Sequence, residues 1–259
     1  MFRAVLLGAT LVLFPHGGRC QPIENVLVET YAVTAGLTDD SVPLTTYRIY
    51  IDLAPGHRLQ MVYGDEHHTL RIASTSWFFN DTVNGAVFGD HIDPDDLNKL
   101  PSALDSWVTI GNASSTHQGI PRHLDRDGSI LECPPYGLRA TVGSTTREQD
   151  LAPLCAIDGL QRDTSVRQIV DFKFASGYFG KVRGDLLETN DGAWAALGGR
   201  KGITEENLVL IAQITTTGRL SYQLNVQVAG PDGAPVKVVA SDATPGERLF
   251  EGLASPPLH

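Results

Sequence analysis

The chain has 259 residues, with 20 basic and 30 acidic side chains and a formal net charge of −10 at pH 7. Such an acidic surface repels phosphate backbones and anionic lipids, which argues against nucleic-acid and membrane-surface partners. After the first twenty residues no segment is apolar enough to span a membrane, and the remaining length suits one large all-β domain or two smaller ones.

The first twenty residues have the layout of a cleaved secretory signal peptide. Arg3 gives a positive start, residues 4–14 form a short, mainly apolar run, and Gly18 and Cys20 place small residues before Gln21. The apolar run is too short to span a bilayer as a stable helix. We expect cleavage after Cys20 and a mature protein that is secreted, with the periplasm or outer surface as alternative addresses. Lipid attachment at Cys20 is a further alternative, against which the preceding arginine argues.

The next segments have the pattern of strands separated by turns. Residues 47–53 and 220–228 alternate as a strand with one wet face does, and the continuous apolar run at 208–212 suits a central strand covered on both faces. Further strands are expected at residues 26–33, 58–63, 69–74, 107–110, 168–174, 193–197 and 236–240. The predicted core contains Ile49, Ile51, Leu210, Ile211, Tyr222, Leu224 and Val226.

Frequent turns and scarce helical periodicity set the fold class. Asp-Gly occurs four times, and each occurrence is a good tight-turn dipeptide. We therefore predict an antiparallel β-sandwich, of jelly-roll or immunoglobulin/cohesin-like type, as a single domain over residues 21–241. Residues 242–259 hold three prolines and little periodicity, which predicts a flexible tail.

Two cysteines lie in the long polar stretch of residues 111–163. Cys133 and Cys155 form an even pair in the mature chain, which in an oxidising compartment predicts one disulfide pinning an irregular excursion. Such a bond contributes about 3 kcal/mol if it is unstrained. Two free buried thiols are the alternative.

The acidic turn that begins at Asp125 resembles the start of a calcium loop. Asp125 and Asp127 are one residue apart and precede Gly128, and calcium prefers hard oxygens at alternate positions with a glycine for the sharp turn. The rest of an EF-hand loop is missing, so a plain Asp-Gly turn is the alternative. Calcium is the only cofactor that the sequence suggests.

The histidines give no sign of a zinc site. His67 and His68 are adjacent and would face opposite sides of a strand, while His91, His117 and His123 are scattered. Zinc needs three convergent ligands. We expect these histidines to be solvated.

Two other clusters have structural explanations. In the acidic cluster of residues 90–96, Asp93 precedes Pro94 and suits the N-cap of a short helix, with a cation site as the alternative. The aromatic run Trp77-Phe78-Phe79 could stack on a sugar ring, but such residues more often close the end of a sandwich core.

Motifs for nucleophilic and zinc-dependent hydrolysis are absent. Neither Gly-x-Ser-x-Gly nor His-Glu-x-x-His occurs in the chain. This favours a protein that is not an enzyme. The alternative is an extracellular glycan hydrolase that uses paired carboxylates.

Several segments together resemble an uncharacterised class of secreted modules from environmental bacteria, notably Bacteroidetes. These modules often sit in large exported proteins with a type IX secretion sorting domain, a pattern that is not seen after Gly230. The resemblance covers about residues 25–228 and implies a secreted, surface-associated role without an assigned reaction. It is carried by Val28-Glu29-Thr30-Tyr31, residues 46–53, Val62-Tyr63-Gly64-Asp65, residues 103–111, Asp127-Gly128-Ser129-Ile130, residues 190–194 and residues 209–216.

The sequence thus favours a secreted, non-enzymatic β-sandwich module that binds or scaffolds extracellular material. Extracellular glycan or cell-surface material is the expected partner.

Overall fold

The computed structural model describes residues 21–34, 42–132, 138–142, 145–149, 152–163, 165, 168–173 and 184–255. Within these ranges the chain is built mainly of strands in antiparallel sheets, with only short helical turns. The all-β class predicted from the alternating pattern is confirmed. No helix in this described part is long and apolar enough to cross a membrane.

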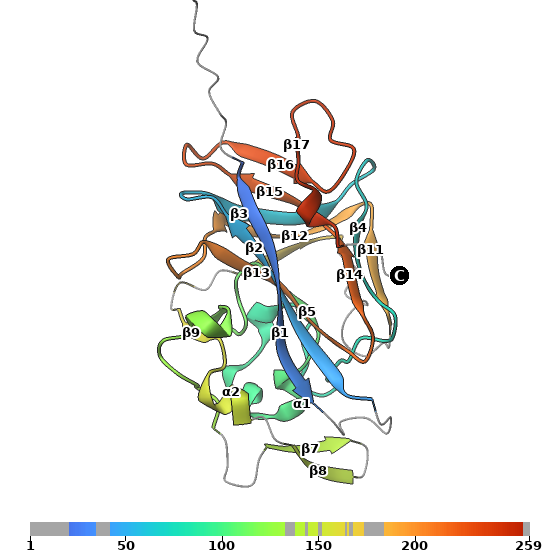
Figure 1. Ribbon diagram of the computed structural model, residues 1–259, viewed down its shortest axis with the longest axis vertical. Coiled ribbons are helices and arrows are strands. Elements are labelled where there is room, and N and C mark those ends of the chain that lie inside the picture. The colour runs from blue at the N-terminus through green and yellow to red at the C-terminus, as the bar shows by residue number, and fades with distance from the viewer. Residues whose placement is uncertain are drawn as a thin grey trace, which may run out of the picture.

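Three sheets form the body of the molecule. Sheet A has the order β1 (Ile23–Thr34), β2 (Leu44–Leu53), β13 (Leu208–Thr216) and β5 (Trp107–Val108). Sheet B has the order β10 (Ile169–Phe172), β12 (Gly192–Arg200), β3 (Arg58–Gly64), β15 (Asn225–Ala229), β16 (Pro235–Val239) and β17 (Arg248–Leu249). Sheet C has the order β11 (Leu186–Thr189), β4 (Leu70–Ser74) and β14 (Leu220–Gln223). In Figure 1 sheet A runs down the middle of the molecule and sheet B lies across its upper part.

The remaining elements are short. Two small antiparallel sheets pair β6 (His117–Gly119) with β9 (Leu160–Arg162) and β7 (Leu138–Val142) with β8 (Thr145–Gln149). The helical turns are η1 (Gly89–His91), η2 (Pro94–Asn98), α1 (Leu100–Ala103), η3 (Arg122–Leu124), α2 (Ala152–Ala156) and η4 (Glu251–Leu253).

The centre of sheet A is covered on both faces, as the apolar run of its central strand predicts, whereas the edge strand β1 is partly exposed. Every residue of β13 is buried. On one face Ile51 and Ile211 pack with sheets B and C in the main core, where Trp194 is fully buried. On the other face Tyr50 and Leu210 pack against the irregular segments that include η2 and α2. Each large side chain buried in this way contributes about 1.5–3 kcal/mol.

Polar contacts fasten the irregular layer to sheet A. The buried Arg48 guanidinium lies 3.5 Å from the centroid of the Tyr31 ring and donates to the Gln213 side chain at 2.9 Å. Arg48 also donates to the carbonyl of Gly159 at 3.1 Å, and the Tyr31 hydroxyl donates to that of Asp158 at 2.8 Å. The predicted irregular excursion therefore exists. Its apolar contacts already include Phe79, so it begins before the expected residue 111.

The segment at residues 220–228 is two strands, not the single strand that its alternation predicts. β14 belongs to sheet C and β15 to sheet B, and the chain changes sheets at Leu224. The Leu224 amide donates to the carbonyl of Leu253 at 2.8 Å instead of to a strand neighbour. Of the predicted core residues only Tyr222 is half-buried, and the others are buried.

The expected flexible tail is wrong for the part of it that is described. β17 pairs parallel to β16, and η4 places Leu253, fully buried, in the main core. The physical reason is that Leu253 fills the place where the chain leaves sheet C for sheet B. The domain therefore extends past residue 241.

Candidate functional site

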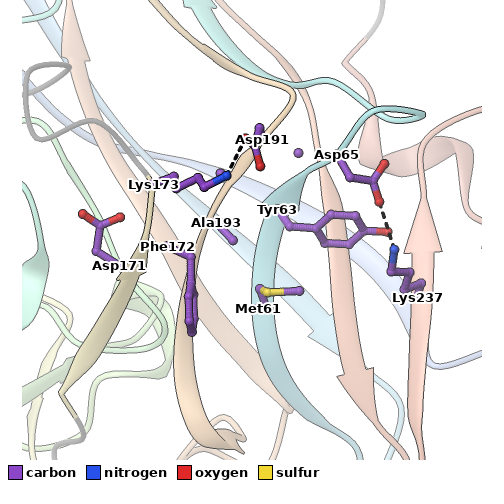
Figure 2. Close-up of a pocket in the computed structure, with 11 residues that line it drawn as sticks. Met61, Tyr63, Asp65, Asp171, Phe172, Lys173, Asp191, Ala193 and Lys237 are labelled. Carbon is purple, nitrogen blue, oxygen red and sulfur yellow. Dashed lines mark hydrogen bonds and ion pairs between the residues drawn. The ribbon is translucent and has the colours of Figure 1, made fainter.

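A groove of about 530 Å³ lies on the outer face of sheet B, away from the main core (Figure 2). This volume is within the range of sites that hold small molecules or short stretches of polymer. Strands β3, β10, β12 and β16 supply its walls. The apolar residues that line it include Met61, Tyr63, Phe172 and Ala193, and the charged ones are Asp65, Asp171, Lys173, Asp191 and Lys237.

The hollow arises because a small residue sits between two aromatic ones. Ala193 on β12 is the register partner of Phe172 on β10 and of Tyr63 on β3. Directly opposite residues on one sheet face have Cβ atoms about 5 Å apart, so the three side chains form one row. The alanine is the floor of this row, and the two rings stand at its sides. Phe172 is 49% exposed, which is unusual for a phenylalanine in a strand.

The charges that flank the groove are paired. Lys237 donates to Asp65 at 2.9 Å, and Lys173 donates to Asp191 at 2.8 Å. Partial burial opposes ionisation of Asp65, but the Lys237 bond and backbone amides hold its pKa below the ordinary value. Asp171 follows the strand alternation and points away from Phe172 (Figure 2). The face of the groove is therefore close to electrically neutral.

The Tyr63 hydroxyl has no hydrogen-bond partner among the described residues. The side chain is only 3% exposed, and the Lys237 ammonium lies 4.8 Å from its ring centroid, within the range of a cation–π contact. Burial, together with the negative charges of Asp65 and Glu247, raises the pKa of Tyr63. The phenol therefore stays protonated and keeps a donor beneath the Asp65–Lys237 pair.

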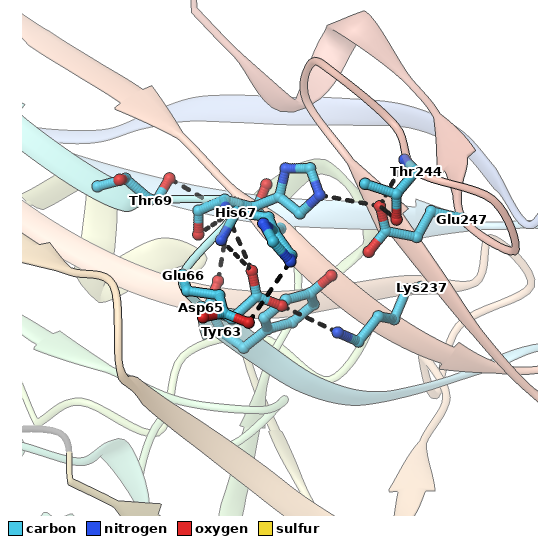
Figure 3. A network of polar contacts seen from close by, with 10 residues as sticks. Tyr63, Asp65, Glu66, His67, Thr69, Lys237, Thr244 and Glu247 are labelled. Carbon is cyan, nitrogen blue, oxygen red and sulfur yellow. Dashed lines mark hydrogen bonds and ion pairs between the residues drawn. The ribbon is translucent and has the colours of Figure 1, made fainter.

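A polar network braces the wall formed by the turn after β3 (Figure 3). The Asp65 carboxylate accepts the backbone amides of His67 and His68 at 3.1 and 3.0 Å. His68 Nε2 lies 2.8 Å from a Glu247 oxygen that also accepts the amide and hydroxyl of Thr244. The turn is thereby tied to the segment before β17. This fixes the position of Asp65 at the groove.

Two carboxylates of the groove, Asp65 and Asp191, are held in ion pairs with lysines. A general acid needs a raised pKa, whereas that of Asp65 is lowered and Asp191 is in an ion pair. Burial raises the pKa of Asp105 to about 8, but this carboxyl accepts the amides of Asp81 and Ala86 inside the irregular layer. The arrangement is suited to binding.

The structure brings Asp125 and Asp127 together at the turn after η3, as their spacing predicts. The Asp125 carboxylate already accepts the amides of Asp127, Gly128 and Gly159, at 3.2, 3.2 and 2.9 Å. Burial and the hydrogen bond with Asp125 raise the pKa of Asp127. No group of three or more His, Cys, Asp or Glu residues in the described ranges is placed to hold a metal ion. Calcium binding at this pair stays a prediction.

Of the two cysteines predicted to form a disulfide, Cys133 lies outside the described residues. Cys155 lies near the end of α2 and is half-buried against the second core, the apolar cluster around Tyr50 and Leu210 on the other face of sheet A. The pairing of Cys133 with Cys155 stays a prediction.

The expectation of solvated histidines is wrong for two of them. The His68 side chain is 3% exposed and bonded to Glu247, and His117 is buried with its Nδ1 3.0 Å from the hydroxyls of Ser114 and Thr116. Burial also lowers the pKa of His117. These polar partners offset the cost of burying an imidazole.

Two structural interpretations of sequence clusters are confirmed. Asp93 caps η2, with its side chain accepting the amide of Asp95 at 3.0 Å. Phe78 packs in the main core and Phe79 in the second core, so neither ring is available to a ligand.

Sequence reasoning missed the groove itself. The sequence does not show that Phe172 lies beside Ala193. The two residues become neighbours only through the pairing register of β10 and β12. Comparison with protein-family models, curated proteins and solved structures finds no match to this chain. The geometry of the groove therefore carries the functional argument.

Proposed function

We propose that this chain is a secreted, non-enzymatic β-sandwich module that binds or scaffolds extracellular material through the groove on sheet B. The observation that carries the proposal is the half-exposed Phe172 beside the alanine floor, flanked by two ion pairs. Apolar hollows with a few placed polar groups are the usual form of binding sites.

Export is supported by the signal-peptide pattern of residues 1–20 and by the resemblance to secreted modules. A disulfide between Cys133 and Cys155 and calcium at Asp125 and Asp127 belong to the same proposal, since both suit an oxidising, calcium-rich exterior. The groove gives the hydrolase alternative little support, because the pKa of Asp65 is lowered and Asp191 is held in an ion pair with Lys173.

The test is binding of the exported chain to a panel of extracellular polymers, compared with a variant whose groove is filled. Ala193→Leu places a larger side chain on the groove floor, and Ala234→Leu makes the same change at an exposed position in the turn between β15 and β16. We expect Ala193→Leu to abolish retention and Ala234→Leu to preserve it. Equal retention by both variants would refute the groove as the binding surface.

Because Ala193 is buried, a second variant at an exposed position of the groove tests the same surface without altering the core. Phe172→Ala removes a ring that is 49% exposed, and Leu249→Ala is its control at the other edge of the same sheet, where the leucine is 45% exposed. Both changes are at the surface and leave the core packing in place. Only Phe172→Ala should weaken retention.

A further inference from the structure

We propose that the ligand of the groove is an uncharged polysaccharide, bound by stacking of a sugar ring and by hydroxyl groups that meet the Asp65–Lys237 pair. This inference rests on the proposed function, since it names the class of material that the same groove binds. Its support comes from the charge, the apolar floor and the hydrogen-bonding groups of the groove.

Charge balance argues against a charged ligand. Asp65 with Lys237 and Asp191 with Lys173 cancel on the groove face. The chain as a whole carries a formal charge of −10, so an anionic polymer is repelled as it approaches. For a cationic polymer, the carboxylates of Asp65 and Asp191 are already engaged by lysines, and that of Asp171 points away from Phe172. An uncharged chain meets neither penalty.

The apolar part of the groove suits the flat face of a sugar ring. That face presents C–H groups, which pack well on an aromatic ring, and Phe172 offers such a ring at the edge strand β10. Ala193 leaves room for the sugar beside it, and Met61 adds an adaptable apolar wall. The row of small and aromatic residues therefore fits a ring lying across the strands.

The polar part of the groove suits hydroxyl groups. The Asp65 and Lys237 side chains are 29% and 42% exposed, and an ion pair this wet contributes only about 0–1 kcal/mol. A sugar hydroxyl can enter between them, donating to the carboxylate and accepting from the ammonium. The buried Tyr63 hydroxyl beneath gains a partner when the pair opens. An uncharged hydroxyl suits this position because it can both donate and accept a hydrogen bond.

A polypeptide ligand fits less well. Its backbone amides and carbonyls need partners, which a protein supplies at the open edge of a sheet. The groove lies on the face of sheet B and not along the outer side of its edge strand β10, and the backbone groups of β12 and β3 are already paired with their neighbours. A peptide laid across this face would leave its own polar groups unpaired.

The experiment measures retardation of the full exported chain in gels that contain one polymer each: galactomannan and hydroxyethyl cellulose as uncharged probes, polygalacturonate as an anionic probe, chitosan as a cationic probe and gelatin as a polypeptide. Binding to the uncharged probes is then measured at about 50 mM and about 500 mM NaCl. Added salt screens charge interactions, so the affinity for an uncharged chain should change less than about twofold.

Variants locate the contact. Phe172→Ala should weaken binding to an uncharged probe about tenfold, and Leu249→Ala should not. Tyr63→Phe should weaken it severalfold while leaving the fold intact, because only one oxygen is removed.

The outcomes separate the two proposals. Binding to galactomannan or hydroxyethyl cellulose that resists salt and depends on Phe172 supports the inference. Groove-dependent binding to polygalacturonate, chitosan or gelatin alone overturns the inference and leaves the proposed function standing. Binding to no probe, or binding unaffected by Ala193→Leu and Phe172→Ala, overturns both.

Discussion

Replacing Tyr63 with phenylalanine should stabilise the free protein. The hydroxyl is buried without a partner in the described structure, and such a group costs about 1–3 kcal/mol. The phenylalanine ring keeps its place beneath the Lys237 ammonium, and the missing oxygen leaves only a small void, so the net gain should be about 1 kcal/mol. For a chain of this size that raises the Tm by about 2–4 °C.

Thermal unfolding followed by circular dichroism measures this change, with Tyr31→Phe as the matched control. The Tyr31 hydroxyl is also buried, but it donates to the carbonyl of Asp158 at 2.8 Å. Removing that bond should lower the Tm by a similar amount, so the two variants should move in opposite directions. A Tm that falls as far in Tyr63→Phe as in Tyr31→Phe would show that the hydroxyl is satisfied in the free protein, and the reasoning about the groove would fail.

Three further predictions concern the rest of the chain. Millimolar calcium should raise the Tm, and the rise should vanish in Asp125→Asn/Asp127→Asn; an unchanged wild-type Tm would end the calcium proposal. Mass spectrometry of the non-reduced protein should find Cys133 joined to Cys155, and two alkylatable thiols in the native protein would contradict the pair. Although its partial burial opposes ionisation, Glu247 has a lowered pKa because of its hydrogen bonds. Its contribution to stability is therefore full above pH about 4.5 and lost as the pH falls, so Glu247→Gln should flatten stability against pH in acid, and an unchanged acid profile would refute this.

The fold could be predicted where the pattern within one strand decides burial. The apolar run of β13 predicted a strand covered on both faces, and all of its residues are buried. The break at Leu224 could not be predicted, because alternation continues through it and the carbonyl that takes its amide belongs to Leu253. Long-range partners of this kind are not encoded in local periodicity.

The groove could not be predicted from the sequence for the same reason. Phe172, Ala193 and Tyr63 are far apart along the chain, and only the pairing of β10, β12 and β3 aligns them in one row. The burial of His68 likewise depends on Glu247, which lies 179 residues further on. The order of residues shows that two known catalytic motifs are absent, but it does not reveal the groove on sheet B.

The position of β13 in sheet A governs when the chain can fold. β2 pairs on one side with β1, a near neighbour in sequence, and on the other with β13, so Asp52 lies opposite Leu208. Such long-range pairings carry a large loop-closure cost and form slowly. The main core also includes Leu253, which lies close to the C-terminal end of the described residues. We therefore expect a chain with this connectivity to complete its fold only after residues close to its C-terminal end are available.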